Sequence, residues 1–209
     1  VYGDLDSSII DELPPGRRPV LTSRLERRDA DKAYAAVREE AARGRQAFVV
    51  CPLVEGSPEE GEGSRVPGKT ELAAAVARYD ELREGPLAGL ELGLVHGRLD
   101  SEEKEKTMRS FAEGRLDVLV ATTVVEVGVD VPNATVMVVE EAQRFGLSQL
   151  HQLRGRVARS RHPARCFLVS GTGLTEAAEM RLAAMLETCL LYTSPSPRDR
   201  TRSRMPSSA

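Results

Sequence analysis

Residues 116–159 read LDVLVATTVVEVGVDVPNATVMVVEEAQRFGLSQLHQLRGRVAR, and this stretch decides the fold of the chain. It holds two short apolar runs that are rich in valine, and each run ends at polar or glycine-containing turn residues. Such runs are typical of strands that are buried on both faces of a parallel sheet. A helical segment follows the second run and leads to three arginines, Arg154, Arg156 and Arg159. We therefore predict the order strand, loop, strand and helix, with a cationic end.

Polar side chains follow the first of these runs directly. In parallel α/β sheets, ligands bind beyond the carboxyl ends of the strands. The arginines that follow the predicted helix can face the same crevice. The sequence therefore predicts a site for a phosphate-bearing ligand, which includes Thr122, Thr123, Glu126, Gly128 and Asp130.

Two segments of this stretch resemble motifs of superfamily 2 nucleic-acid helicases. The segment ATTVVEVGVD at 121–130 resembles motif V, and QLRGRVAR at 152–159 resembles motif VI. The wording is most similar to the RecG family, and the similarity runs from about Tyr2 to about Thr188. A match of this length is a stronger indication than either short motif alone. One position departs from motif VI, which normally has glycine where this chain has Ala158.

The resemblance implies a three-layer α/β domain of the RecA-like type with a mainly parallel sheet, forming the second motor domain of an ATP-dependent DNA helicase. It implies ATP as the cofactor, with Mg²⁺ held by the first motor domain. It implies nucleotide contacts at Glu126, Gly128 and Asp130. It implies catalytic contacts with the ATP phosphates at Gln152, Arg156 and Arg159. It implies DNA contacts at Thr122, Thr123, His96 and Arg98.

Each of these residues also has a plainer interpretation. Asp130 can shape a turn, and Thr122 can pair with a strand end. His96 can be a satisfied donor in a turn, and the arginines can form surface salt bridges with Glu140 and Glu141. The joint spacing of the residues, more than any one of them, favours the helicase interpretation.

The rest of the chain alternates short apolar runs with segments of helical periodicity, as an α/β domain requires. Strands are predicted over 20–25, 46–53, 90–95 and 166–170. Helices are predicted after Asp29 or Asp31 as the N-cap, over 69–82, after Asp100 as the N-cap, and over 174–187.

Composition places the domain boundaries. Residues 1–18 contain two prolines and a glycine at 14–16 and no sustained period, which predicts a linker. The resemblance to the RecG family implies that this linker comes from a missing first motor domain. Residues 19–188 form the RecA-like domain. Residues 189–209 carry four arginines and one aspartate, a charge of +3 (4 − 1), in a chain whose net charge is −3. We predict a disordered, non-native tail there, although a basic tail could also bind nucleic acid.

A P-loop pattern at Gly63–Thr70 (GSRVPGKT) is a coincidence in our interpretation. In a working P-loop the glycine-rich turn leaves a buried strand directly, so that backbone N–H groups and a helix N-terminus converge on phosphate. Here nine residues (54–62) separate the predicted strand from Gly63, and four of the nearby residues are glutamates. The chain also has no DExH sequence. We therefore expect the chain alone not to hydrolyse ATP.

Composition also limits the function. A net charge of −3 does not indicate a dedicated DNA-binding domain, so any DNA contact is expected to be local. No apolar stretch approaches the roughly 20 residues that cross a bilayer, and no signal-peptide pattern opens the chain. We expect a cytoplasmic location and no membrane partner. The three cysteines show no CxxC spacing, and Cys51 and Cys166 are expected to be core thiols, not metal ligands.

For the parent protein, the resemblance predicts a helicase or translocase that remodels branched or forked DNA in recombination and repair. Two alternatives stay open. A translocase of the transcription-repair coupling factor type shares wording like FGLSQLHQLRGRV at 145–157. A non-catalytic module could use the same crevice to bind nucleic acid without turnover.

Overall fold

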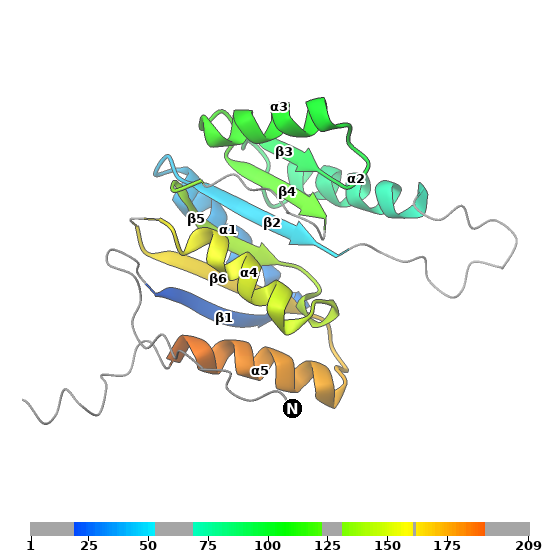
Figure 1. Cartoon of the computed structure of the whole chain (residues 1–209), viewed down its shortest axis with the longest axis vertical. Coiled ribbons are helices and arrows are strands. Elements are labelled where there is room, and N and C mark those ends of the chain that lie inside the picture. Colours follow the sequence, from blue (N-terminus) through cyan, green and yellow to red (C-terminus); the bar gives the residue numbers. More distant parts are fainter. Residues whose placement is uncertain (1–18, 53–68, 123–130, 161, 191–209) are drawn as a thin grey trace, which may run out of the picture.

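Every strand in the described part of the chain runs parallel to its neighbours. The computed structural model describes residues 19–52, 69–122, 131–160 and 162–190. The strands are β1 (Val20–Glu26), β2 (Gln46–Cys51), β3 (Leu92–Val95), β4 (Val118–Thr122), β5 (Ala134–Val139) and β6 (Ala164–Ser170). They form one sheet in the order β1-β6-β5-β2-β4-β3 (Figure 1). Because all six strands are parallel, their carboxyl ends lie at one edge of the sheet, which we call the carboxyl edge.

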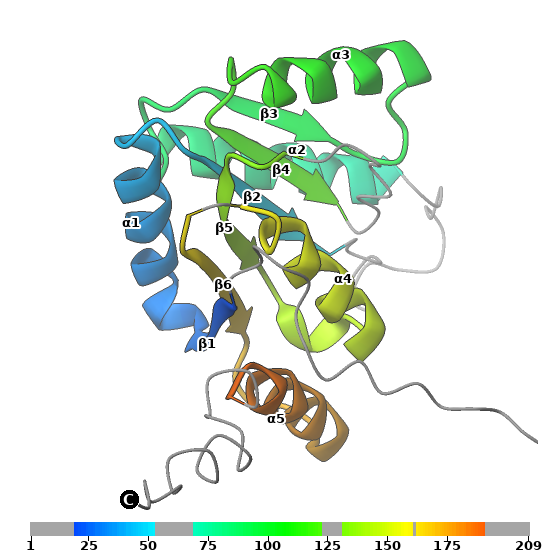
Figure 2. The same cartoon turned by 60° about the vertical axis from the view of Figure 1, so that its left-hand side comes forward.

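Helices cover both faces of this sheet. They are α1 (Ala30–Ala41), α2 (Lys69–Glu84), α3 (Ser101–Ala112), α4 (Leu147–Val157) and α5 (Glu176–Leu190), with 3-10 turns η1 (Arg27–Asp29) and η2 (Ala142–Arg144). One core cluster contains residues of α1 and α2, and the other contains residues of α3, α4 and α5. Figure 2 shows α1 and α4 on opposite sides of the sheet. The predicted three-layer α/β fold with a parallel sheet is therefore confirmed.

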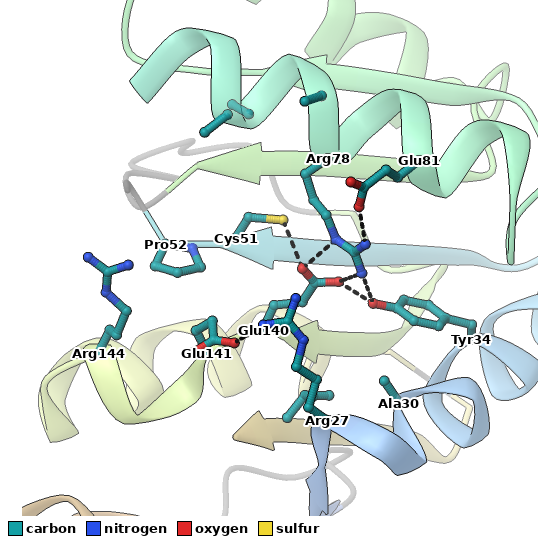
Figure 3. Close-up of a pocket in the computed structure, with 14 residues that line it drawn as sticks. Arg27, Ala30, Tyr34, Cys51, Pro52, Arg78, Glu81, Glu140, Glu141 and Arg144 are labelled. Atoms are coloured by element: carbon teal, nitrogen blue, oxygen red, sulfur yellow. Dashed lines mark hydrogen bonds and ion pairs between the residues drawn. The ribbon is translucent and has the colours of Figure 1, made fainter. Parts of the chain in front are cut away.

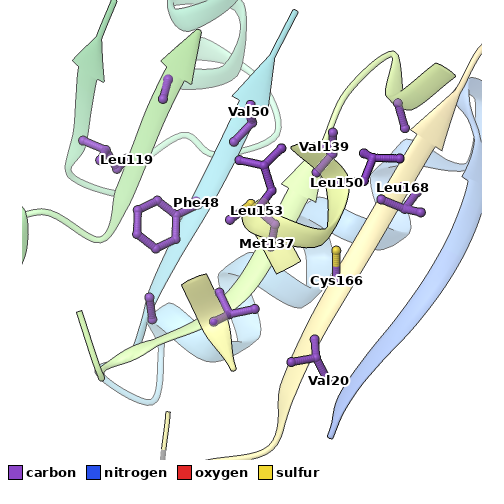
Figure 4. Packing of buried hydrophobic residues seen from close by; sticks show 14 of the residues in the cluster. Val20, Phe48, Val50, Leu119, Met137, Val139, Leu150, Leu153, Cys166 and Leu168 are labelled. Atoms are coloured by element: carbon purple, nitrogen blue, oxygen red, sulfur yellow. The ribbon is translucent and has the colours of Figure 1, made fainter. Parts of the chain in front are cut away.

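The central strands are buried at every position. All residues of β2, β4 and β5 are buried, which explains why these strands read as continuous apolar runs and do not alternate. Figure 4 shows how side chains of neighbouring strands pack beneath α4. Phe48 of β2 meets Phe111 of α3 edge to face, with ring centroids 5.0 Å apart. Cys51 and Cys166 are buried free thiols, as predicted.

Several element boundaries differ from the prediction by one to three residues, and one predicted cap lacks its side-chain hydrogen bond. Strand β2 ends at Cys51 because Pro52, which follows, has no N–H to continue the ladder. Strand β3 begins two residues later than predicted, since the Asp117 carboxylate accepts the N–H of Glu91 at 2.9 Å. Asp29 stands at the N-cap of α1, but its carboxylate accepts a hydrogen bond from Lys32 at 2.6 Å instead of capping the helix. By contrast, the predicted cap of α3 is present: Asp100 accepts the N–H of Glu103 at 2.7 Å.

A buried carboxylate, Glu40 of α1, ties this helix to the sheet. Its side chain is 5% exposed. It accepts hydrogen bonds from Arg43 at 2.6 Å, Arg45 at 2.7 Å and Thr135 at 2.9 Å, and Arg165 of β6 lies 3.5 Å away. Burial alone would raise the pKa of Glu40, but the hydrogen bonds outweigh burial and lower the pKa below its ordinary value.

We expect Glu40→Gln to reduce the free energy of unfolding by about 2 kcal/mol at neutral pH, because hydrogen bonds to a charged group contribute roughly 1.5–3 kcal/mol. The folded-state pKa lies below the ordinary 4.5, so this contribution is fully present above that pH. It is lost as the pH falls through the folded-state value. Urea unfolding between about pH 3 and 7 measures it.

The difference between the unaltered chain and Glu40→Gln should shrink at the acid end of that range. The exposed Glu84→Gln, near the end of α2, is the matched control and should show little difference at any pH. A difference for Glu40→Gln that stays constant with pH would show that the carboxylate charge is not its source.

Candidate functional site

Helix α4 carries the predicted catalytic side chains on its accessible face. The opposite face packs into the core through Leu150, Leu153 and Val157. Gln152 and Arg156 are four residues apart, and Arg159 follows three residues later, just beyond the helix, so this spacing places all three on one side. Gln152 and Arg159 are exposed, and Arg156 is half-buried. Two guanidinium groups on one accessible face suit a ligand that carries phosphate.

The turn after α4 accommodates Ala158 without strain. This residue has φ −68° and ψ −7°, in the right-handed helical region that any residue adopts. Its side chain packs against the core cluster below α4. The backbone here does not require the glycine that is usual in motif VI, so the approach of Arg159 does not depend on that glycine.

Arg154 differs from the other two arginines of motif VI. Its guanidinium donates to the backbone carbonyl of Met185 in α5 at 3.2 Å and lies 3.1 Å from Nδ1 of His151. Burial, together with the charge of Arg154, lowers the pKa of His151. Residues two apart in a helix point to nearly opposite sides. Arg154 therefore holds α5 against α4, while Arg156 extends in another direction.

The connection from β5 into α4 has one strained residue. Glu141 has φ 47° and ψ 45°, the left-handed conformation that costs a non-glycine residue about 1 kcal/mol. Its carboxylate lies 3.3 Å from Arg27 and accepts from Gln143 at 2.6 Å. The side-chain oxygen of Gln149 then accepts the N–H of Gly146 at 2.9 Å and caps the start of α4.

The predicted DNA-contact residues that the structure describes lie at the carboxyl edge. Thr122 is the last residue of β4, 5% exposed, and is in register with Cys51, the last residue of β2. His96 and Arg98 follow β3, and the N–H of Arg98 donates to Nδ1 of His96 at 3.2 Å. Burial lowers the pKa of His96, which favours the neutral ring at neutral pH. These residues thus follow neighbouring strands.

The arginines of α4 lie away from this edge. Helix α4 follows β5 at the carboxyl edge and leads back to the start of β6 at the opposite edge. With a rise of 1.5 Å per residue, its eleven residues span roughly 16 Å. The structure therefore separates two groups of predicted site residues. The described residues predicted to contact DNA lie at the carboxyl edge, and the arginines predicted to contact the ATP phosphates lie toward the far end of α4.

Four predicted site residues, Thr123, Glu126, Gly128 and Asp130, lie outside the described residues. The first described residue after them, Val131, is 3% exposed and belongs to the same core cluster as Leu153 and Val157 of α4. Val131, which directly follows Asp130, therefore lies on the same face of the sheet as α4, the helix that carries Arg156. Most of the P-loop-like stretch also lies outside the described residues. β2 ends at Cys51 and α2 begins at Lys69, and the coincidental reading of that stretch stays a prediction.

A pocket of about 510 Å³ between α1 and α2 was not predicted (Figure 3). Its floor is a polar network around Glu140, the residue that follows β5. The Glu140 carboxylate accepts two hydrogen bonds from Arg78 of α2, at 2.8 and 2.7 Å, and one from the hydroxyl of Tyr34. The Cys51 thiol lies 3.6 Å from the same carboxylate. Burial, with the charge of Glu140, raises the pKa of both Tyr34 and Cys51, so both keep their protons.

The sequence contained one sign of this network. A glutamate directly after a buried strand needs a partner, because an unpaired buried charge is costly. We considered Glu140 and Glu141 as partners of the motif VI arginines, but the structure pairs Glu140 with Arg78 and Glu141 with Arg27. The guanidinium of Arg78 comes from 62 residues earlier in the chain, and no local pattern indicates that pairing.

Among the residues that the structure describes, no group of three or more His, Cys, Asp or Glu side chains could hold a metal ion. Within the same part of the chain, no helix has the length and apolar character needed to cross a membrane.

Comparison with known proteins gives a family. The family model described as the helicase conserved C-terminal domain matches residues 31–161. The ATP-dependent DNA helicase RecG of Thermotoga maritima is 50% identical over 178 residues, which is 85% of this chain and 22% of that protein. RecG of Bacillus subtilis is 43% identical over 188 residues, 90% of this chain and 26% of that protein. The chain thus spans about a quarter of the length of these curated relatives.

Solved structures give the same fold. The structure of RecG bound to a three-way DNA junction is similar with a TM-score of 0.67 and 41% identity, over 91% of this chain and 24% of that one. Helicase domain 2 of the DEAD-box protein Mss116p, bound to an RNA duplex, has a TM-score of 0.54 at 15% identity, over 87% of this chain and 67% of that one. The second likeness shows the fold alone.

Proposed function

Because the chain belongs to the helicase conserved C-terminal domain family, we propose that it is the second motor domain of an ATP-dependent DNA helicase that remodels branched DNA. The observation that carries the proposal is the 50% identity to a RecG protein over 85% of the chain, within a fold whose α4 places Gln152 and Arg156 on one side, with Arg159 just beyond its end. A RecG protein has been solved with a three-way DNA junction. Forked or branched DNA is therefore the proposed partner, in recombination and repair.

In this proposal, ATP lies between the chain and the first motor domain of the same parent. That domain binds most of the triphosphate and holds Mg²⁺, and it connects through residues 1–18. The chain contributes Arg156 and Arg159, which stabilise the charge that develops on the γ-phosphate, and Gln152 beside them. Glu126, Gly128 and Asp130 complete the nucleotide contact. The position of Val131 beneath α4 supports this grouping.

The same proposal assigns DNA to the carboxyl edge. Thr122 and Thr123 contact a backbone phosphate, and His96 and Arg98 contact the same strand beyond β3. A neutral His96 can donate or accept a hydrogen bond there without adding charge. Residues 19–188 make up the working domain, residues 189–209 are a non-native tail, and the location is cytoplasmic.

We expect the isolated chain to bind DNA without showing DNA-stimulated ATPase. Phosphate release by the purified chain, with and without forked DNA, measures the ATPase activity. Binding by fluorescence anisotropy measures the DNA binding. Thr122→Val should weaken binding without regard to base sequence and should reduce the slope of log affinity against log salt only slightly, because a hydroxyl carries no charge and releases no counterions. Thr107→Val in the middle of α3 is the matched control and should leave the DNA affinity unchanged.

Robust turnover by the isolated chain would contradict the division of labour between the two motor domains. An unchanged DNA affinity in Thr122→Val, with an equally unchanged control, would remove Thr122 from the DNA site.

A further inference from the structure

The pocket between α1 and α2 lies on the same sheet face as the proposed DNA contact. Cys51 lines the pocket, and its side chain belongs to the core cluster on the α1 and α2 face. Thr122 is the register partner of Cys51. Partners in neighbouring parallel strands direct their side chains to the same face, so Thr122 faces the same layer as the pocket.

Glu140, the buried carboxylate of the pocket floor, is already paired. Arg78 makes two hydrogen bonds with Glu140 and a third, at 2.6 Å, with Glu81. Tyr34 donates to Glu140 as well. An anion that approaches the pocket therefore does not meet a bare negative charge at its floor.

The rim of the pocket carries two arginines that the core does not use. Arg144 follows β5, is exposed, and makes no side-chain hydrogen bond or ion pair within the described part of the chain. Arg27 follows β1, and its side chain is 78% exposed. Its contact is to Glu141 at 3.3 Å, while Gln143 donates to the same carboxylate at 2.6 Å. Such an exposed ion pair contributes little, so Arg27 can exchange it for a phosphate.

The spacing of these residues matches a nucleic-acid backbone. Adjacent strands lie about 4.8 Å apart, so the end of β5 is roughly 10 Å from the end of β4. Phosphates of one DNA strand rise about 3.4 Å per nucleotide along the helix axis, so this distance covers about three of them. A strand that contacts Thr122 therefore reaches Arg144, which follows β5, within about three nucleotides. Arg27 follows β1, two strands further along the sheet and roughly 19 Å from the end of β4, and is reached within about six nucleotides.

We propose that Arg27 and Arg144 hold backbone phosphates of the DNA strand that Thr122 contacts, which extends the DNA track along the carboxyl edge from β3 to β1. This inference rests on the proposed function. The pocket opens beside α1 and α2, whereas Arg156 and Arg159 belong to the layer of α4 on the other face. The two arginines of the rim are thus placed for DNA and not for the ATP between the motor domains.

The test is binding of the full 209-residue chain to a fluorescein-labelled forked DNA between about 50 and 300 mM KCl. Arg27→Ala/Arg144→Ala should lower the slope of log affinity against log salt by about 1.5, at roughly 0.7–0.9 per phosphate, and should weaken binding about 30-fold at 0.1 M salt. Arg27→Lys/Arg144→Lys should retain most of the affinity, because a lysine also neutralises a single phosphate. Thermal unfolding should be the same for all variants.

The control is Arg83→Ala/Arg115→Ala, which removes two exposed positive charges from the end of α2 and from the turn before β4, at the opposite edge of the sheet. It should keep the slope. The inference is wrong if Arg27→Ala/Arg144→Ala keeps the slope of log affinity against log salt. It is also wrong if the control variant lowers that slope by the same amount. If the unaltered chain does not bind the forked DNA, the proposed function fails and the extended track fails with it.

Discussion

In the intact parent protein, Arg159→Lys is expected to reduce DNA-stimulated ATP turnover by on the order of 10³, with DNA affinity nearly unchanged. Charge spreads onto the γ-phosphate oxygens during phosphoryl transfer, and a guanidinium that arrives when the motor domains close stabilises it. Lysine keeps the charge but replaces a planar fork with a point charge. DNA affinity survives because Arg159 lies near the far end of α4, away from the carboxyl edge. Arg156→Lys should show the same pattern with a smaller loss.

Steady-state ATPase and DNA affinity are measured on the same preparations. The exposed Arg83→Lys on α2 is the matched control, since it makes the same chemical change on a different helix. Near-normal turnover combined with lost DNA binding would mean that Arg156 and Arg159 are DNA ligands. In that case the assignment to ATP is wrong.

The largest effect on stability is expected at Arg78. Arg78→Met should reduce the free energy of unfolding by about 3 kcal/mol, the lower end of the roughly 3–5 kcal/mol lost when one partner of a buried pair is removed. The lower end applies because the Arg78 side chain is 31% exposed, while the residue Glu140 is 9% exposed. Replacing both partners, in Arg78→Met/Glu140→Met, should restore much of the loss, because no buried charge is then left unpaired.

Urea unfolding of the isolated chain measures these differences. Arg83→Met, five residues further along α2, is the control for helix propensity and surface charge. If Arg78→Met costs no more than this control, Glu140 finds enough water or other donors to remain solvated, and the network is not a source of stability.

The sheet could be predicted because its central strands obey a simple rule. β2, β4 and β5 are buried along their whole length, so each reads as an uninterrupted apolar run between turn residues. Their ends were less certain, because a strand stops where a backbone donor is missing or taken. Pro52 supplies no donor, and Asp117 takes the N–H of Glu91. The pattern of apolar residues does not show which backbone N–H groups are missing or are bound by a side chain, so it does not fix the ends of the strands.

The helix that carries Gln152 and Arg156 could be predicted, while the roles of these residues toward ATP stay a prediction. The spacing of Gln152 and Arg156 is a property of α4, and Arg159 follows two residues after the end of that helix. The network of Glu140, Arg78 and Tyr34 joins β5, α2 and α1, and its contacts cross 62 and 106 residues of sequence. Similarly, motif VI gives no sign that Arg154 reaches the backbone of Met185. Long-range pairing of polar groups depends on how helices pack, which a local pattern does not specify.

Strand β1 is one of the two outermost strands of the described sheet. It pairs with β6, starting with Val20 opposite Ala164. These partners are 144 residues apart (164 − 20), so β1 leaves the ribosome long before its neighbour exists. At roughly 5–20 residues per second, synthesis separates the two by about 7–30 s. During that interval the backbone donors and acceptors of β1 have no ladder to join, and its Leu21 and Leu25 are open to other chains. The order of synthesis thus makes the first strand of the sheet one that stays unpaired until the last strand has been made.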